Sequence, residues 1–376
     1  MGRRVRVGVI FGGRSGEHEV SIRSAAAIIE NIDRKKYEVL PVAITKEGKW
    51  LAPAEATKLL PHSTHQLLSA GSTRATGDVA ILGDPSHQGL ISLDSRSGLP
   101  SEKLDVIFPA LHGPLGEDGT VQGLLEMADI PYVGCGVLAS ACGMDKVTMK
   151  LLFAQADLPI CKYVWFLRSH WQTAEAEVIR KISRYLGFPC FVKPANLGSS
   201  VGVSKATDRA SLKAAVNLAG EYDRKIIVEE GLDAREIECA ILGNDEPRAS
   251  LPGEYVVHDE ASRFLDYTEK YSNTGNVQFV VPAPISKTLT NQIQRLAVRA
   301  FQAVDGSGLA RVDFFLRRDT KELLLNELNT MPGLTEVSGY PKMWAASGLP
   351  FADLFERLIK LAFERHQEKS LLKTSI

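Results

Sequence analysis

The stretch "GLARVDFFLRRDTKELLLNELNTMPG" (308–333) decides the fold prediction for this chain. Its two apolar runs, "LARVDFFL" and "KELLLNEL", have the length of β-strands, and the "RRDT" between them is typical of a turn. Side chains alternate along a strand, so Glu327 and Asn329 are expected on one face. The aliphatic neighbours Leu325 and Leu328 suit a core.

The same hairpin predicts a metal site. Asp313 comes from the first strand, and Glu327 and Asn329 come from the second. Two carboxylates and an amide oxygen are hard ligands, which suit Mg²⁺ or Mn²⁺ held partly by substrate phosphates. The alternative is a hairpin whose acidic side chains simply face water. The hairpin alone does not decide between them.

The bulk composition narrows the class of protein. With 376 residues the chain is expected to hold two or three domains. Its net charge of −1 points to neither nucleic acid nor membrane as a partner, and no apolar stretch has the length of a membrane span. The start "MGRRVRVGVIFGG" is better read as a first strand than as a signal peptide. Five cysteines without a CxxC pair predict free thiols in a reducing cytoplasm.

The first unit, residues 1–140, alternates strands and helices. Aliphatic strands with helices between them predict a parallel sheet covered on both faces. Residues 53–101, rich in Ser, Gly, His and Thr, are expected to form an irregular excursion on this domain. The expected strands are 5–11, 37–44 and 104–111, and the expected helices are 21–32 and 121–128.

Two further units are expected, at 141–232 and 233–376. The first of them begins near a helix that ends before Pro159, and it contains a helix at 171–186 with strands at 188–194 and 225–230. The last unit starts with a strand at 235–243 and holds the metal-binding hairpin. It finishes with an amphipathic helix, "FADLFERLIKLAFERH", whose apolar residues recur three and four apart.

A second motif, "KPANLGSSVGVSK" (193–205), predicts phosphate binding. Lys193 closes a strand, and the small residues after it let backbone N–H groups approach an anion closely. The motif is not a P-loop, because GxxxxGK[ST] is absent. An ordinary Gly-Ser hairpin loop is the competing interpretation of the loop alone, and the strand-terminal lysine favours phosphate.

Two other strand ends are candidate ligand sites. Glu17 and Glu19 follow the first strand, and His112 follows the strand at 104–111. The carboxyl ends of strands in open α/β sheets are where ligands bind. Helix capping is the alternative role for the two glutamates, and it suits Glu19 better than Glu17.

Together these segments resemble the D-alanine–D-alanine ligases of the ATP-grasp superfamily, and the longer N-terminal domain is similar to that of the larger subgroup. The resemblance runs in order along nearly the whole chain. It rests on "VIFGGRSGEHEVS", "DVIFPALHGPLGEDGTVQGLLE", "PYVGCGVLASACGMDK", "FVKPANLGSSVGVSK", "VEEGLDAREIECAILG", "FLDYTEKY", "GLARVDFFL" and "NELNTMPGLTEVS".

The resemblance implies a fold and a reaction. The fold is an ATP-grasp arrangement of three α/β domains, with the nucleotide between the central and C-terminal ones. One D-alanine carboxylate takes the γ-phosphate of ATP, and the amine of a second D-alanine attacks the resulting acylphosphate, for peptidoglycan precursor synthesis. The implied partners are ATP, D-alanine and two Mg²⁺ or Mn²⁺ ions, in a cytoplasmic homodimer.

The resemblance also implies roles for individual residues. Glu17 would hold the ammonium of the first D-alanine with His112 nearby, Ser338 the carboxylate of the second, and Arg311 and the N–H of Gly333 the oxyanion. Ser199 and Tyr271 would hydrogen-bond to each other and shut out water. Asp313, Glu327 and Asn329 would hold the metal ions. The implied ATP contacts are Lys146, Lys193, Gly198, Ser199, Ser200, Val201, Gly202, Glu229, Glu230, Leu232, Glu236 and Lys270, the last of which also lies toward the substrates.

The sequence departs from the family pattern at two positions. Leu265 in "FLDYTEKY" stands where an aromatic residue is common, which affects the packing of that loop. Gly339 stands where a larger residue is frequent, so it alters the shape of the second substrate subsite.

Three rival functions stay open at this stage. A D-alanine–D-lactate ligase would share the ATP site but usually lacks the tyrosine of "EKY", which here is Tyr271. A nucleotide-binding module without catalysis would lose Glu17, Arg311 or a metal ligand. Another ATP-grasp carboxylate–amine ligase, or a carboxylase subunit that needs no ammonium site, would share the fold, and Glu17 in its motif argues against the carboxylase.

Overall fold

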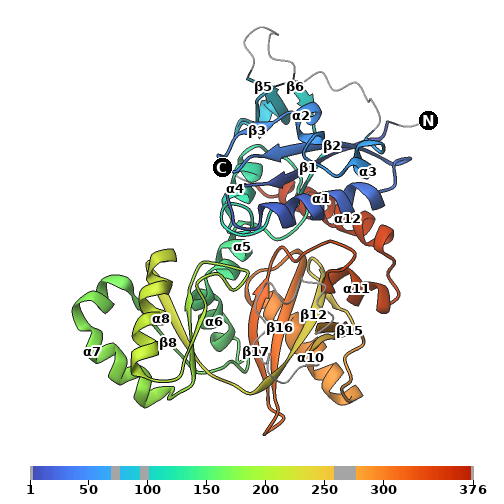
Figure 1. Ribbon diagram of the computed structural model, residues 1–376. Coiled ribbons are helices and arrows are strands. Elements are labelled where there is room, and N and C mark those ends of the chain that lie inside the picture. Colours follow the sequence, from blue (N-terminus) through green and yellow to red (C-terminus); the bar gives the residue numbers. More distant parts are fainter. Residues whose placement is uncertain (1–2, 69–76, 94–100, 258–276, 374–376) are drawn as a thin grey trace.

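The computed structural model describes residues 3–68, 77–93, 101–257 and 277–373. It is a mixed α/β structure, and the described residues form four sheets. Figure 1 shows the N-terminal sheet at the top of the molecule, with two further sheets side by side below it. Many of the predicted ATP-binding residues lie where the central and C-terminal sheets face each other.

The N-terminal sheet has the strand order β3-β2-β1-β7. Its members are β1 (Val5–Gly12), β2 (Tyr37–Ile44), β3 (Trp50–Leu51) and β7 (Val106–Pro109). β1 pairs in parallel with both β2 and β7, and only the short edge strand β3 is antiparallel. The parallel sheet predicted from the aliphatic strands is therefore confirmed.

Helices cover both faces of this sheet, as predicted, but one of them comes from the far end of the chain. α1 (His18–Asn31) and the last helix α12 (Phe351–Ser370) share a core with β1 and β7, and Figure 1 shows them lying alongside each other. The Phe355 ring packs edge-on against Phe108, with 5.8 Å between ring centroids. α4 (Thr120–Met127) packs on the opposite face.

The prediction of an irregular excursion at 53–101 is wrong for much of its described part. This part contains a three-stranded antiparallel sheet in the order β4-β5-β6. Its strands bury Val79 and Leu90 against the N-terminal domain, but the apolar runs are too short to show a period. The elements are α2 (Pro53–Thr57), α3 (His62–His65), β4 (Val79–Ala80), a 3₁₀ turn at 85–87, β5 (Gly89–Ser92) and β6 (Ser101–Lys103).

The central sheet is antiparallel throughout, in the order β10-β9-β11-β8. Its strands are β8 (Tyr163–Leu167), β9 (Cys190–Pro194), β10 (Ser204–Ala206) and β11 (Lys225–Glu230). α7 (Arg168–Tyr185) and α8 (Arg209–Tyr222) share its core on one side. α5 (Val137–Met144) and α6 (Lys146–Gln155) connect it to the N-terminal domain.

The C-terminal sheet runs in the order β15-β14-β12-β16-β17, with β13 paired to β12. It faces α10 (Lys287–Ala303) through a large apolar core, and α11 (Gly339–Ala346) follows the last strand. The strands are β12 (Ala234–Gly243), β13 (Arg248–Ala249), β14 (Gly253–Val257), β15 (Val277–Val280), β16 (Gly308–Arg317) and β17 (Leu323–Asn329).

The hairpin that decided the fold prediction is β16–β17, and it contains a β-bulge. Asp313 pairs with Glu327, but the next residue, Phe314, pairs with Leu325, so Asn326 has no opposite partner. Strict alternation would put Leu325 on the same face as Glu327. The extra residue turns Leu325 into the core, where it is fully buried.

The domain boundaries stay a prediction. The boundary between 232 and 233 falls between β11 and β12, whereas that between 140 and 141 falls inside α5. All five cysteines are free thiols, as predicted. In the described ranges, no helix has the length and apolar character needed to cross a membrane.

Candidate active site

The first helix turn of α6 positions Lys146 between two parts of the site. Asp145 caps this helix by accepting hydrogen bonds from the backbone N–H groups of Val147 and Thr148, both at 3.0 Å. Lys146 Nζ donates to the carbonyl of Leu197 at 2.5 Å and lies 3.9 Å from Glu327 Oε2. Lys146 therefore links the Gly-Ser loop to one of the predicted metal ligands.

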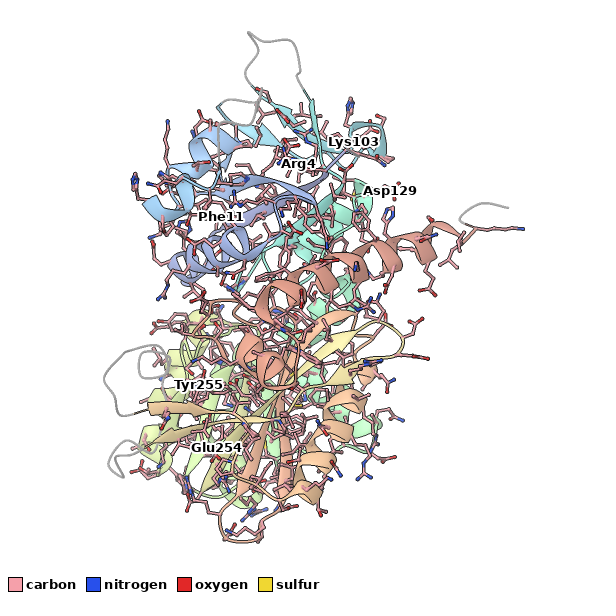
Figure 2. All side chains as sticks on the ribbon, turned by 90° about the vertical axis from the view of Figure 1, so that its right-hand side faces the viewer. Arg4, Phe11, Lys103, Asp129, Glu254 and Tyr255 are labelled. Atoms are coloured by element: carbon pink, nitrogen blue, oxygen red, sulfur yellow. The ribbon has the colours of Figure 1, made fainter. Side chains whose placement is uncertain are left out.

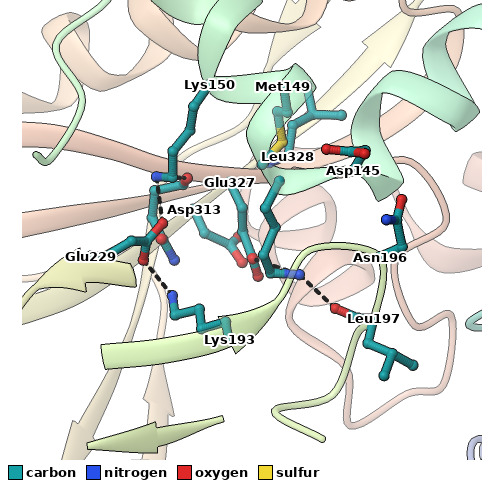
Figure 3. Close-up of polar contacts among 12 residues, drawn as sticks. Asp145, Met149, Lys150, Lys193, Asn196, Leu197, Glu229, Asp313, Glu327 and Leu328 are labelled. Atoms are coloured by element: carbon teal, nitrogen blue, oxygen red, sulfur yellow. Dashed lines mark hydrogen bonds and ion pairs between the residues drawn. The ribbon is translucent and has the colours of Figure 1, made fainter. Parts of the chain in front are cut away.

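Glu229 on β11 is held between two lysines. Lys193 Nζ lies 2.6 Å from Glu229 Oε2, and Lys150 Nζ lies 2.9 Å from Oε1. Figure 3 shows the two lysines approaching the carboxylate from opposite sides. Burial alone raises the pKa of Glu229, but the two ammonium groups outweigh burial and lower it to about 2. The carboxylate is therefore ionised throughout the physiological range.

The loop after Lys193 has an unusual backbone conformation. Ser199 and Ser200 both have left-handed backbones, with φ of 53° and 58°, and Gly202 follows at 70°. A Cβ on Gly202 would lie 2.8 Å from Pro194 Cγ, so the glycine also fits a close approach. Left-handed backbone at non-glycine residues costs about 1 kcal/mol or more each and is concentrated at functional sites.

Glu17 meets this loop from the N-terminal domain. The Ser199 hydroxyl donates a hydrogen bond to Glu17 Oε1. Glu17 is the residue before α1, yet its side chain makes no capping hydrogen bond. Glu19, in contrast, is exposed and pairs with Lys46 at 3.1 Å. The geometry thus separates the two glutamates and favours a ligand role for Glu17 over helix capping.

His112 is buried, and both of its ring nitrogens have partners. Nδ1 lies 3.1 Å from the carbonyl of Met331, so it carries the proton, and Nε2 lies 3.0 Å from the Ser24 hydroxyl, which donates to it. Burial lowers the pKa of His112 and favours this neutral form. His112 therefore ties the N-terminal domain to the segment before Gly333, and its predicted substrate contact stays a prediction.

Glu117 is a site residue that the sequence reasoning missed. It is buried beside Glu17 and accepts a hydrogen bond from the backbone N–H of Gly113 at 2.8 Å. Burial, and then the charge of Glu17, raise the pKa of Glu117 to about 8. Its position in "HGPLGEDG", a Gly-rich loop directly after a strand, is the signal that could have singled it out.

A pH experiment tests the state of Glu117. Between about pH 4.5 and 8 the folded chain keeps a proton that the unfolded chain has lost, so the free energy of unfolding falls as pH rises through this range. Glu117→Gln cannot titrate, so the variant should not show this fall in the free energy of unfolding, which amounts to at most about 5 kcal/mol in wild type. The quantity to measure by calorimetry is the melting temperature of the variant minus that of wild type. We expect this difference to increase by several degrees from pH 5 to pH 8.5.

The control for this experiment is Glu19→Gln, because Glu19 is an exposed carboxylate at the start of α1, two residues after Glu17. Its melting temperature should differ from that of wild type by the same small amount at every pH. If the Glu117→Gln curve also ran parallel to the wild-type curve, Glu117 would be ionised in the folded protein and the assignment would fail.

The three predicted metal ligands lie at nearby positions on the paired strands β16 and β17. Asp313 and Glu327 are cross-strand partners, and Asn329 is the partner of Arg311 two pairs further along, on the same face. Asn329 Oδ1 accepts a hydrogen bond from the N–H of Met331 at 2.9 Å, which fixes the amide. No group of three His, Cys, Asp or Glu side chains gathers as a metal site in the described part of the chain. Two carboxylates and an amide oxygen fit a hard cation that shares phosphate oxygens.

Arg311 lies directly beside these ligands. Its guanidinium donates two hydrogen bonds to Asp313, from Nε at 2.7 Å and from Nη2 at 2.6 Å, and its Nε lies 3.3 Å from the buried Glu238. This bidentate pairing fixes the plane of the guanidinium. The arrangement holds a guanidinium in a fixed position beside the predicted metal ligand Asp313.

Ser338 and Gly339 lie at the start of α11. Ser338 is buried, and its hydroxyl lies 2.7 Å from the Thr335 hydroxyl at the positive end of the helix dipole. A Cβ on Gly339 would lie 2.7 Å from Glu238 Oε2 and 2.9 Å from the Phe279 ring. Those two side chains fill the space that a larger residue at 339 would need, which explains this departure from the family pattern.

A cleft between the central and C-terminal sheets brings many of the predicted residues together. Gly202 and Val201 lie in the adjoining loop, outside the residues that line the cleft. Lys270, Tyr271 and Leu265 lie outside the described residues, so their predicted roles stay predictions. The predicted residues that line the cleft are Lys146, Lys193, Gly198, Ser199, Ser200, Glu229, Glu230, Leu232, Glu236 and Glu327.

Comparison with known proteins decides the family. Residues 6–135 match the family model described as the D-ala D-ala ligase N-terminus, and residues 152–360 match the D-ala D-ala ligase C-terminus. The chain belongs to the D-alanine–D-alanine ligase family. It is 49% identical to a D-alanine–D-alanine ligase of Heliobacterium modesticaldum over 96% of each chain. A ligase of the same description from Geobacillus kaustophilus is also 49% identical, over 98% of this chain and 97% of the relative.

Solved structures of this ligase family have the same fold. A D-alanine–D-alanine ligase from Coxiella burnetii superposes with a TM-score of 0.82 at 36% identity, covering 98% of this chain and 97% of its own. A D-Ala:D-Ser ligase from Enterococcus faecalis gives the same score and identity over 96% of this chain and all of its own. The predicted α/β, ATP-grasp fold is thereby confirmed.

Proposed function

We propose that this chain joins two D-alanines into D-alanyl-D-alanine with ATP, for peptidoglycan precursor synthesis. The observation that supports this most directly is the contact between Glu17 and Ser199. A carboxylate from the N-terminal domain meets the predicted phosphate loop there, so an amino acid's ammonium and a nucleotide's phosphates can be held side by side. An ATP-grasp carboxylase would need no such ammonium site.

The first step transfers a phosphoryl group. Glu17 holds the ammonium of the first D-alanine, whose carboxylate oxygen attacks the γ-phosphorus of ATP, and ADP leaves. Lys146, Lys193 and the loop at 198–202 hold the phosphates. Asp313, Glu327 and Asn329 would hold Mg²⁺ or Mn²⁺, which neutralises charge on the phosphate oxygens when it is bound. The product is a D-alanyl phosphate.

The second step forms the peptide bond. The neutral amine of the second D-alanine attacks the carbonyl carbon, and phosphate leaves after the amine has lost a proton. Arg311 and the backbone N–H of Gly333 stabilise the oxyanion, and Ser338 at the start of α11 holds the second carboxylate. Closure against water is essential, because an exposed acylphosphate hydrolyses. We assign this closure to Ser199 together with Tyr271.

A second candidate concerns the acceptor only. One structural neighbour is a D-Ala:D-Ser ligase at 36% identity, and a D-lactate acceptor would use the same ATP site. "EKY" with Tyr271 favours an amine acceptor, and among amines we propose D-alanine. The proposal also includes a homodimer in the cytoplasm, where ATP is available and the five free thiols stay reduced.

The test is a turnover assay with the purified chain, ATP, Mg²⁺ and the acceptors D-alanine, D-serine and D-lactate in competition. We expect phosphate release that depends on D-alanine, with one D-alanyl-D-alanine formed per phosphate, as determined by mass spectrometry. Absence of D-alanine-dependent phosphate release would refute the proposal. If D-alanyl-D-serine or the D-lactate ester dominated the product, then D-serine or D-lactate would be the preferred acceptor in place of D-alanine.

The ammonium site can be tested separately. In Glu17→Gln the ion pair with the first D-alanine is lost, and the KM for that D-alanine should rise by about a hundredfold while the KM for ATP changes little. Steady-state kinetics at varied concentrations of each substrate measure both values. Glu19→Gln is the matched control and should resemble wild type. Equal rises in both KM values would indicate a structural role for Glu17.

A further inference from the structure

The end of α8 lies against both ends of the Gly-Ser loop (196–202), and the proposed mechanism gives it no role. Asp223 Oδ2 accepts hydrogen bonds from the backbone N–H of Asn196 at 2.8 Å and from its side-chain amide at 2.9 Å. At the other end of the loop, a Cβ on Gly202 would lie 2.8 Å from Tyr222 Cδ2. Two adjacent residues at the end of one helix therefore support the first and the last residue of the loop.

A second contact joins the same region to α6. The ammonium of Lys225, at the start of β11, donates to Asp145 Oδ2, and Asp145 is the cap of α6. Burial raises the pKa of Asp145, but the Lys225 ammonium and the capping N–H groups outweigh burial and lower it. The backbone N–H of Lys146 donates to the carbonyl of Ala195 at 3.0 Å, and Figure 3 shows Asp145 and Asn196 at this junction. The loop and Lys146 are thus held by one connected set of contacts.

The loop needs support at its ends because its own backbone is strained. Ser199 and Ser200 have φ of 53° and 58°, a conformation that L-residues rarely adopt by local preference. The middle of the loop faces the N-terminal domain, which lies above the other two domains in Figure 2, and Ser199 donates there to Glu17. Since Glu17 is assigned to the substrate ammonium, this contact is shared with the substrate. A loop that is ordered before its ligand arrives binds the ligand more tightly, because less conformational entropy is lost on binding.

We propose that Asp223 is a positioning residue for triphosphate binding, which holds the Gly-Ser loop in the conformation that receives the phosphates, and that Lys225 does the same for Lys146. The inference rests on the proposed function in taking this loop and Lys146 as the phosphate site. Asp223 supports groups that are assigned to the phosphates. Its loss should therefore weaken the binding of a triphosphate and leave the binding of adenosine unchanged.

The test compares two ligands by calorimetry and requires no turnover. The first is the non-hydrolysable ATP analogue AMP-PNP with Mg²⁺, and the second is adenosine, measured by competition with AMP-PNP. In Asp223→Ala the loop loses the acceptor of both Asn196 hydrogen bonds, so the affinity for AMP-PNP should fall about tenfold. The affinity for adenosine should equal that of wild type, whereas a general loss of structure would lower both affinities.

Lys225→Met tests the second contact and also provides the test if Asp223→Ala does not fold. Without the ammonium, Asp145 still accepts the two capping N–H groups, so α6 is retained while Lys146 is held less firmly. The affinity for AMP-PNP should fall about threefold, as expected for a partly exposed ion pair, and that for adenosine should not change. Lys225→Arg keeps the positive charge and should restore the affinity for AMP-PNP.

Asp208→Ala is the matched control. Asp208 caps the opposite end of α8, about 20 Å along the helix from Asp223, where it accepts from the N–H of Ser211 at 2.8 Å. Its loss weakens the same helix, and both affinities should equal those of wild type. Equal losses for the two ligands in Asp223→Ala, or an unchanged affinity for AMP-PNP, would overturn the inference, and the same holds for Lys225→Met. A wild type that does not bind AMP-PNP would refute the proposed function instead.

Discussion

Glu327→Gln and Asn329→Ala should each lower the rate of dipeptide formation about a thousandfold, which corresponds to about 4 kcal/mol of barrier, with the fold unchanged. Each variant removes one oxygen donor of the three-residue ligand set. The other carboxylate of this set is Asp313 on the facing strand β16, and it cannot replace the lost donor alone. The measurement is kcat under saturating ATP and D-alanine, with circular dichroism as the check on folding.

A direct metal measurement accompanies the kinetics. Binding of Mn²⁺ in the presence of ADP, followed by electron paramagnetic resonance, should weaken in both variants. Glu322→Gln is the matched control, since it makes the same chemical change at an exposed position where the β17 strand begins. Either variant retaining more than about a tenth of the wild-type rate, with normal Mn²⁺ binding, would show that the ligand assignment is wrong.

Arg311→Met should have two large effects at once. It removes a donor proposed for the oxyanion, so kcat should fall by about a hundredfold to a thousandfold. It also leaves Asp313 and the buried Glu238 without the guanidinium, so the free energy of unfolding should fall by about 3 kcal/mol. Kinetics and urea denaturation measure the two effects independently.

The β16 strand supplies a close control for this variant. Arg317 makes the same two-residue bidentate pair with Asp319, at 3.1 and 3.0 Å, but in an exposed position. Arg317→Met should cost less than about 1 kcal/mol and leave kcat unchanged. If Arg311→Met behaved like Arg317→Met, the pairing of Arg311 would be an ordinary surface contact.

Much of the fold could be predicted because local patterns and tertiary structure agree. The strands at 37–44 and 225–230 have the predicted bounds, and the last amphipathic helix begins at Phe351 as predicted. α1 begins at His18, three residues before the predicted start. The prediction began too late because the first residues of the helix are polar or acidic and do not show the apolar helical pattern. Helix boundaries depend on capping contacts, which a pattern does not contain.

Features that depend on distant residues could not be predicted. The bulge at Asn326 is set by the register between two strands, so strict alternation along β17 does not reveal it, although the aliphatic character of Leu325 correctly indicated a core position. The partners of His112 lie on α1 and after β17, 88 and 219 residues away along the sequence. The raised pKa of Glu117 could not be predicted for the same reason, since it arises from burial and from Glu17, a hundred residues earlier, although the Gly-rich loop that carries Glu117 is visible in the sequence.

The packing of α12 on the N-terminal sheet affects how the chain reaches this structure during its synthesis. β1 is synthesised more than 300 residues before α12, the helix that covers one of its faces. Until Phe355 is synthesised, the apolar face around Phe108 lacks part of its cover, and exposed strands of this kind aggregate readily. We therefore expect the N-terminal half without α12 to aggregate more readily than the whole chain. Removing the last helix should harm the first domain more than the domain from which the helix is cut.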